Sequence, residues 1–236
     1  MKSVSKKDDE EFAAYLRSAR HDLLAAIKEP ARFQPYLDAV ADLKVERVLD
    51  VGCGVGQMLY PLAVLKGAFG VGLDPTLQAC QMGRDFYAEH APDARLQFVY
   101  GRAEKLPFPS SSFDVVNCGL ALPYMDNKRA LEEIARVLRR GGVLLLRIHH
   151  TRYYLRDLWQ SLIALRPLWT IHTGRVLAVG AIYHLTGKQT RTRLLGSETF
   201  QTRWLLRREL ARRGLSLTAE RSDSNPQTPS FVISKK

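Results

Sequence analysis

Three glycines alternate with other residues directly after a short apolar run that ends in a carboxylate. The segment reads Val48-Leu49-Asp50-Val51-Gly52-Cys53-Gly54-Val55-Gly56. Its apolar part is typical of a strand buried on both faces, as in a parallel sheet. Glycine lacks a Cβ atom, so it tolerates positive φ and lets a ligand approach the backbone closely. A helix predicted over residues 57–66 would place its free N–H groups beside this turn.

The carboxylate of Asp50 indicates which ligand suits the turn. The G-x-G-x-G spacing differs from the G-x-G-x-x-G of dinucleotide-binding turns, and Asp50 would repel a pyrophosphate. A ligand with an ammonium or sulfonium group and a small carboxylate fits better. Backbone N–H groups would bind its carboxylate, and Asp50 would attract its cation. The alternative interpretation is a glycine loop with a structural role only.

A second acid, Asp74, follows the apolar run 68–73 and precedes Pro75. It lies roughly 20 residues beyond the glycine turn, the offset at which an acid meets ribose hydroxyls in nucleotide-binding α/β units. A carboxylate offers paired acceptors to two vicinal hydroxyl donors. The alternative is that Asp74 caps the helix predicted over residues 76–90.

These segments resemble those of the class I S-adenosylmethionine-dependent methyltransferases. The glycine turn resembles the family's first motif, and residues 113–118 match its F-D-x-V strand. Residues 101–108, which read G-R-A-E-K-L-P-F, resemble the G-D-A-E-x-L-P-F segment of small-molecule members, including the quinone-biosynthesis group. The resemblance covers about residues 46–148. It implies methyl transfer from S-adenosyl-L-methionine to a small molecule by in-line attack on the sulfonium methyl, with S-adenosyl-L-homocysteine as product.

The resemblance also implies which residues bind the cofactor. They are Asp50, Gly52, Cys53, Gly54, Gly56, Asp74, Pro75, Arg102, Ala103, Glu104, Gly119 and Leu120. In the family, an acidic residue at the position of Arg102 accepts a hydrogen bond from the adenine amino group. Arginine has no acceptor atom, so Arg102 cannot make this contact. Adenine would then be held by Glu104, by stacking on Arg102, or by the backbone alone.

Three side chains are candidates for taking a proton from the methyl acceptor. His149 and His150 follow the fifth strand, and Tyr124 lies beyond the fourth. A hydroxyl acceptor would benefit from a base, whereas an amine or an activated carbon needs less help. The alternative interpretation is that the histidines are packed polar residues. We expect no metal, because no third ligand with suitable spacing accompanies them.

The order of segments predicts an α/β fold: a Rossmann-like, doubly wound and mostly parallel seven-stranded sheet, with a helical insertion after the fifth strand. The sequence predicts strands over residues 48–51, 68–74, 95–100, 113–118, 143–148, 215–221 and 230–234. Further helices are expected over residues 8–29, 33–43, 126–140, 153–163, 175–185 and 198–213. The predicted parts are a helical cap (1–45), the cofactor-binding core (46–150), a helical insertion or lid (151–196), and a closing helix and strand hairpin (197–236).

The chain has 236 residues, of which 46% are hydrophobic, enough for a sizeable core. Its three scattered cysteines show no disulfide framework, and its charged N-terminus lacks an export signal, so we expect a cytoplasmic protein.

Residues 150–236 hold 15 Lys and Arg against 5 Asp and Glu, whereas the preceding part is nearly neutral. This basic segment supports an alternative, a methyltransferase that acts on RNA or on a lipid at an anionic surface. A second alternative is a cofactor-binding protein without transferase activity, for which Arg102 is the only indication. The identity of the acceptor and the oligomeric state stay open.

Overall fold

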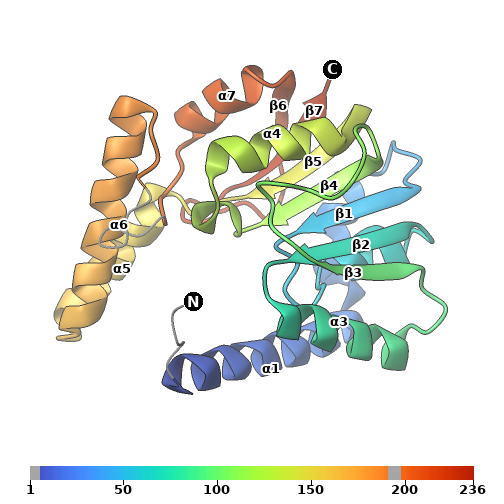
Figure 1. Cartoon of the computed structure of the whole chain (residues 1–236), viewed down its shortest axis with the longest axis horizontal. Helices are drawn as coiled ribbons and strands as arrows, with labels where there is room; N and C mark the ends of the chain where they lie inside the picture. The colour runs from blue at the N-terminus through green and yellow to red at the C-terminus, as the bar shows by residue number, and fades with distance from the viewer. Residues whose placement is uncertain (1–5, 191–197) are drawn as a thin grey trace.

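The computed structural model describes residues 6–190 and 198–236, with side chains from Ala14 onward. Its sheet has seven strands in the order β3-β2-β1-β4-β5-β7-β6 (Figure 1). The strands are β1 Arg47–Val51, β2 Phe69–Asp74, β3 Leu96–Tyr100, β4 Phe113–Gly119, β5 Leu138–Arg147, β6 Leu215–Glu220 and β7 Ser230–Lys235. The first five run parallel, and β7 pairs antiparallel with both β5 and β6. The predicted fold class, with its closing antiparallel hairpin, is confirmed.

Helices cover both faces of the sheet (Figure 1). They are α1 Lys6–Lys28, α2 Gln34–Asp38, α3 Leu77–His90, α4 Asn127–Val137, α5 Thr151–Ile163, α6 Pro167–Thr186 and α7 Arg203–Ala211. One core packs α4 and α7 against the sheet through residues such as Ile134 and Leu210. Another packs α1 and α3 near β3, with Leu16, Phe86 and Phe98 buried. Because a parallel strand inside the sheet is covered on both faces, β1 is buried from Val48 to Val51.

The helix predicted over residues 57–66 is reduced to one π-helical turn, η2, at Tyr60–Val64. Pro61 supplies no N–H to the turn before it. The backbone bonds that follow are wide, with Leu65 N–H donating to Tyr60 O and Ala68 N–H donating to Ala63 O. The N–H groups next to the glycine turn therefore belong to a chain of single turns and not to a regular α-helix.

Helix α4 ends at Val137, three residues before the predicted end, and β5 begins at once. Gly141 and Gly142 lie inside this strand, where Gly141 has a φ of +72°. A Cβ atom at Gly142 would lie 2.8 Å from the backbone oxygen of Asp114, so only glycine fits this close approach. The glycine pair marks an irregular stretch of strand opposite Phe113 and not a helix end.

The helix predicted over residues 198–213 begins only at Arg203. The side chain of Thr202 caps it by accepting the N–H of Leu205, and such a cap needs a non-helical residue. Residues before the cap are extended, and Gln201 forms a bridge with His150. Two other helices differ in length from the prediction: α2 is shorter than the predicted 33–43, and α6 extends beyond the predicted 175–185.

In the described residues, no helix is both long enough and apolar enough to cross a bilayer.

Candidate functional site

A cavity of about 680 Å³ lies at the carboxyl ends of the central strands. Eleven of the residues predicted to form the site line it: Gly52, Gly54, Asp74, Pro75, Arg102, Ala103, Glu104, Gly119, Leu120, Tyr124 and His149. Its volume lies in the range typical of ligand sites. Residues distant in sequence converge here because parallel strands all end at this edge of the sheet.

Four predicted residues do not line this cavity. Asp50 is 2% exposed and lies below the glycine turn, where Asn117 Nδ2 donates to its Oδ1 at 2.7 Å. Cys53 faces an adjoining cavity of about 500 Å³. The carbonyl of Gly56 accepts the hydroxyl of buried Tyr87 at 2.7 Å. His150 caps α5 and lines a separate depression.

The glycine turn has the conformation that its composition predicts. Gly52, Gly54 and Gly56 have φ values of +71°, +54° and +86°. A Cβ atom on Gly52 would lie 2.4 Å from that of Ala121, and one on Gly56 would lie 2.9 Å from the ring of Phe98. Gly54 lines the cavity and is different, because a Cβ atom there would meet only Gln57 Oε1, at the ordinary contact distance of 3.5 Å. Gly52 and Gly56 therefore allow tight packing, whereas Gly54 leaves room beside the backbone.

Asp74 joins the glycine turn to the start of α3. Its Oδ2 accepts the N–H of Gly54 at 3.0 Å, and its Oδ1 accepts the N–H of Thr76 at 2.9 Å. Burial raises the pKa of the Asp74 carboxyl, and these two N–H groups offset part of that rise. Each oxygen keeps a second lone pair, so the carboxylate can still accept two hydroxyl donors from the cavity. The N-cap of α3 is Thr76 and not Asp74, so the predicted capping role of Asp74 is wrong, and its bond to the Thr76 N–H leaves the predicted ligand role open.

Burial raises the pKa of Asp50 to about 7, although the Asn117 amide works against the rise and Asp74 adds to it. A buried carboxyl with such a pKa changes charge near neutrality. A cation placed close to it would favour the ionised form.

The carboxylate of Glu104 accepts hydrogen bonds from two neighbouring segments of the chain. Its Oε1 accepts from Arg102 Nη2 at 3.0 Å and from the N–H of Asp126 at 3.0 Å. Burial opposes ionisation of this carboxyl, but the two donors outweigh it and hold its pKa below the usual value. Glu104 thus ties the loop after β3 to the start of α4.

His149 lines one wall of the cavity and is surrounded by aromatic residues. Its ring stacks on Tyr153, with centroids 4.3 Å apart and planes 6° from parallel. Tyr154 donates its hydroxyl to Glu198 Oε1 at 2.9 Å and lies 3.4 Å from His149 Nδ1. Because the hydroxyl proton is used by the carboxylate, the Tyr154 oxygen is left to accept from Nδ1–H. This arrangement assigns the lone pair of the imidazole to Nε2.

Burial, and next the Arg147 cation, lower the pKa of His149 to about 4. The imidazole is therefore neutral at pH 7. Burial followed by Glu198 raises the pKa of Tyr154, which stays protonated.

Sequence reasoning missed the contact of Glu198 with Tyr154. Glu198 comes 49 residues after His149 in the chain, and no spacing pattern links the two. Tyr15 of α1, which sequence reasoning offered as a residue facing the site, lines the cavity.

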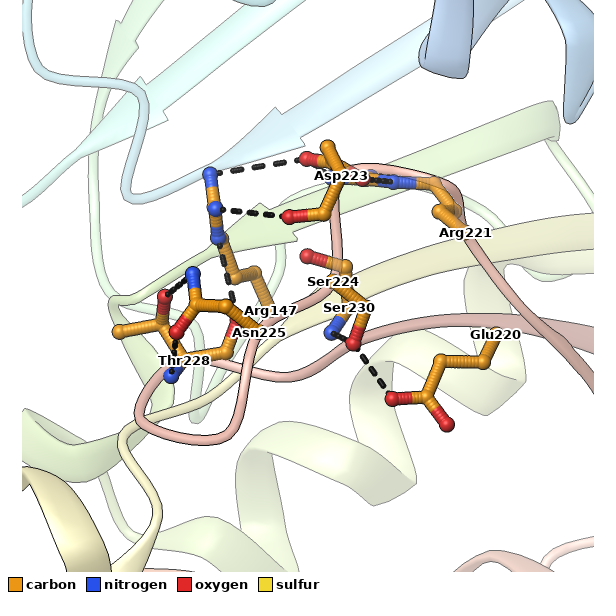
Figure 2. Close-up of polar contacts among 8 residues, drawn as sticks. All are labelled: Arg147, Glu220, Arg221, Asp223, Ser224, Asn225, Thr228 and Ser230. Atoms are coloured by element: carbon orange, nitrogen blue, oxygen red, sulfur yellow. Dashed lines mark hydrogen bonds and ion pairs between the residues drawn. The ribbon is translucent and has the colours of Figure 1, made fainter.

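The adjoining cavity is bounded by the closing hairpin of the sheet. Figure 2 shows Arg147, at the end of β5, turned towards Asp223 between β6 and β7, with Nη1 and Oδ2 3.6 Å apart. Arg221 binds the same carboxylate through two nitrogens, at 2.8 and 2.9 Å, and lies 3.8 Å above the ring of Tyr36. This network holds the β6–β7 turn against β5 and α2.

Comparison with known proteins agrees with this geometry. Residues 49–146 match the model of a family described as a methyltransferase domain. This segment is a class I S-adenosylmethionine-dependent methyltransferase domain. It contains the glycine turn, Asp74, the Arg102–Glu104 segment and the strand before His149.

Two relatives resemble the methyltransferase domain in sequence. The ubiquinone/menaquinone biosynthesis C-methyltransferase UbiE of Hahella chejuensis is 38% identical over 42% of this chain and 41% of its own. The fatty-acid O-methyltransferase of Mycolicibacterium smegmatis is 38% identical over 55% of this chain and 46% of its own. The chain thus spans less than half the length of these relatives.

A solved structure resembles the whole chain in fold. It is the magnesium protoporphyrin IX methyltransferase of Synechocystis PCC 6803 with bound S-adenosylhomocysteine, with a TM-score of 0.60 and 16% identity. The match covers 100% of this chain and 90% of that one. The elements outside residues 49–146 therefore also have counterparts in a methyltransferase fold.

Proposed function

We propose that this protein transfers a methyl group from S-adenosyl-L-methionine to a small-molecule acceptor. The observation that carries the proposal is the space beside Gly54, next to a carboxylate of Asp74 that has acceptor capacity to spare. A nucleoside ligand without phosphates fits this combination. The backbone can approach it closely, and two acceptors are ready for its ribose hydroxyls.

Each part of the ligand has a group to hold it. Asp74 would bind the ribose, and the backbone of Gly119 and Leu120 would contact the amino-acid end. The N–H groups of Gly52 and Gly54 already donate to Leu73 O and Asp74 Oδ2, so these glycines would contribute space beside the backbone. Ala103 and the flat guanidinium of Arg102 would flank the adenine. Arg102 suits this role better than Glu104, because the Glu104 carboxylate already serves two donors.

When bound, the cofactor supplies an electrophilic sulfonium methyl group. The chain's own residues would align the acceptor and exclude water. His149 would accept a hydrogen bond from the acceptor at Nε2, and Tyr153 and Tyr154 would hold its ring in place. An imidazole with a pKa of about 4 is a weak base, so His149 orients an acceptor better than it removes a tightly held proton.

The acceptor wall is mainly apolar and aromatic, with Tyr15, Ala121, Tyr124 and Met125 beside His149. The two relatives are named for quinone biosynthesis and for fatty-acid O-methylation, and both names indicate small-molecule acceptors. We therefore expect a small acceptor with an apolar body.

A screen with methyl-labelled cofactor tests this proposal. The protein is incubated with small-molecule, lipid and RNA fractions of a cell extract, and the label in each fraction is counted. We expect label in the small-molecule or solvent-extracted lipid fraction. Label confined to RNA would contradict the proposed acceptor class, and tight cofactor binding with no label in any fraction would contradict methyl transfer itself.

A further inference from the structure

The outer face of the α5–α6 hairpin is apolar. Six large side chains there are each at least 65% exposed: Trp159, Ile163, Leu165, Leu168, Ile171 and Leu185. Single exposed hydrophobic residues are common, but a continuous group marks an interaction surface. We call these six residues the hairpin face.

The hairpin face follows from the way α6 packs. Val176, Val179 and Tyr183 turn inwards and are buried. A Cβ atom on Gly180 would lie 2.3 Å from the ring of Phe200, so this side of the helix already touches the body of the protein. The opposite side carries Leu168, Ile171 and Leu185 at helical spacing over about 26 Å. A surface helix with a single partner is normally polar on that side.

The hairpin projects from the sheet beyond its central strands (Figure 1). Helix α5 starts two residues after His149, whose ring stacks on Tyr153. The base of the hairpin therefore packs against a residue that lines the cavity.

The charges around the hairpin face are positive. Residues 151–187 contain four arginines, at positions 152, 156, 166 and 175, and one acid, Asp157. The carboxylate of Asp157 is used between the two helices, where it accepts from Trp169 Nε1 at 2.8 Å and from Thr173 Oγ1 at 2.7 Å. Arg152, Arg156 and Arg166 are exposed, whereas Arg175 is half-buried, so the outward-facing charge of the hairpin is basic.

Charge decides between two kinds of occupant. In a symmetric contact between two copies, the same face meets itself and the arginines of each copy lie near those of the other, which costs free energy. An anionic lipid surface would attract the arginines and accept the apolar side chains. Tryptophan next to arginine on an apolar helix is the composition of helices that lie in a membrane interface.

We propose that the α5–α6 hairpin is a membrane-docking element, which inserts the hairpin face into the interface of a bilayer that contains anionic lipid. The arginines bind headgroup phosphates, and the apolar side chains enter the acyl boundary. Docking would place the methyl-transfer cavity beside the membrane, where acceptors with an apolar body dissolve. The proposal concerns the surface only and does not depend on transferase activity.

Sedimentation with vesicles tests the proposal on the full chain without cofactor. The vesicles contain equal parts of phosphatidylcholine and phosphatidylglycerol, or phosphatidylcholine alone. We expect binding to the anionic vesicles, weakened by added salt, and at least tenfold weaker binding to the neutral ones. The double variant Leu168→Ser/Ile171→Ser should lose at least tenfold in affinity for the anionic vesicles.

A matched control changes two exposed leucines far from the hairpin, Leu65→Ser/Leu77→Ser, which should leave vesicle binding unchanged. Circular dichroism confirms that each variant is folded. Light scattering gives the oligomeric state. The proposal is overturned if the wild-type chain ignores anionic vesicles, if the control variant loses as much affinity as the hairpin variant, or if the hairpin face instead holds a dimer that Leu168→Ser/Ile171→Ser dissociates.

Discussion

At the scale of single residues, the buried carboxyl of Asp50 should make cofactor binding depend on pH. In the free protein the native state keeps the Asp50 proton up to about pH 7, whereas the unfolded chain loses it near 3.8. Native stability from this group therefore falls as pH rises through that window. A bound cation favours the ionised form and reverses the trend for the complex.

We accordingly expect the affinity for S-adenosylmethionine to rise with pH by up to about tenfold per unit below pH 7, and to level off above it. Asp50→Asn should abolish this dependence, and S-adenosylhomocysteine, which lacks the sulfonium charge, should show less of it. Calorimetric titrations from pH 5 to 8 measure the effect. Equal pH dependence in the wild type and in Asp50→Asn would contradict the role of Asp50.

His149 and His150 are adjacent in the sequence but lie in different surroundings. A substitution at His150 can therefore serve as the control for the same substitution at His149. His149→Asn should lower the rate of methyl transfer by at least about tenfold while leaving S-adenosylhomocysteine affinity within a factor of about three. His150→Asn keeps an acceptor for the helix cap and lies outside the cavity, so its rate should match the wild type. Rates are measured with the labelled acceptor fraction.

The pH profile of the same variants separates orientation from titration. Because the pKa of His149 is about 4, the imidazole is neutral from pH 6 to 9. The ratio of wild-type to His149→Asn rates should therefore be constant over that range. A ratio that increases with pH around 6.5 would show a histidine that titrates normally.

At the scale of elements, the turn between β1 and η2 combines backbone strain at positive φ with close packing. Gly67 has the strain without the packing, so a comparison with it separates the two contributions. Gly52 and Gly67 have similar φ values, +71° and +64°, but a Cβ atom on Gly67 would meet nothing within 4 Å. Gly67→Ala should cost about 1 kcal/mol of unfolding free energy from strain alone.

Gly52→Ala adds a collision with Ala121 and should cost about 2 to 4 kcal/mol. Urea unfolding followed by circular dichroism measures both variants. Equal losses at the two positions would mean that the turn adapts to the added methyl group, against the packing described here.

The elements that sequence reasoning predicted well are those with local causes. The glycine turn, Asp74 and the strand of Phe113 each follow from residue type and immediate neighbours. The errors arose where a distant contact or one residue decided the outcome. Pro61 shortened a helix, and the approach of Gly142 to Asp114 turned an expected helix end into strand. The contact between Glu198 and Tyr154 depends on tertiary folding, which no spacing pattern shows.

At the scale of the whole molecule, the three cysteines report on global unfolding. Cys53, Cys80 and Cys118 are buried and free. Burial, followed by the charge of Asp50, raises the pKa of Cys118 to about 12. We expect no rapid reaction with a thiol reagent in the native state and three reactive thiols in denaturant. A fast-reacting thiol in the native protein would show that the core opens locally.

The basic excess of the C-terminal part is only partly neutralised inside the molecule. Glu209 pairs with Arg212 and Arg213, and Arg203 pairs with Glu220. In the described residues, no ion pair joins an acid to the hairpin arginines, although Glu198 contacts His172 and Tyr154 of the hairpin. Residues 151–187 carry only part of the basic excess, with four arginines and one acid, and most of it lies in residues 188–236. The docking proposal uses the exposed arginines at positions 152, 156 and 166.

The central claim is that the cavity beside Gly54 holds a nucleoside cofactor, and one calorimetric titration tests it most directly. S-adenosylhomocysteine is titrated into the wild type, Gly54→Ala and Gly67→Ala. The two variants carry similar backbone strain, but Gly54 lines the cavity and Gly67 does not. We predict that the wild type and Gly67→Ala bind alike and that Gly54→Ala loses at least about tenfold in affinity. Undiminished binding by Gly54→Ala, or no binding by the wild type, would contradict the account.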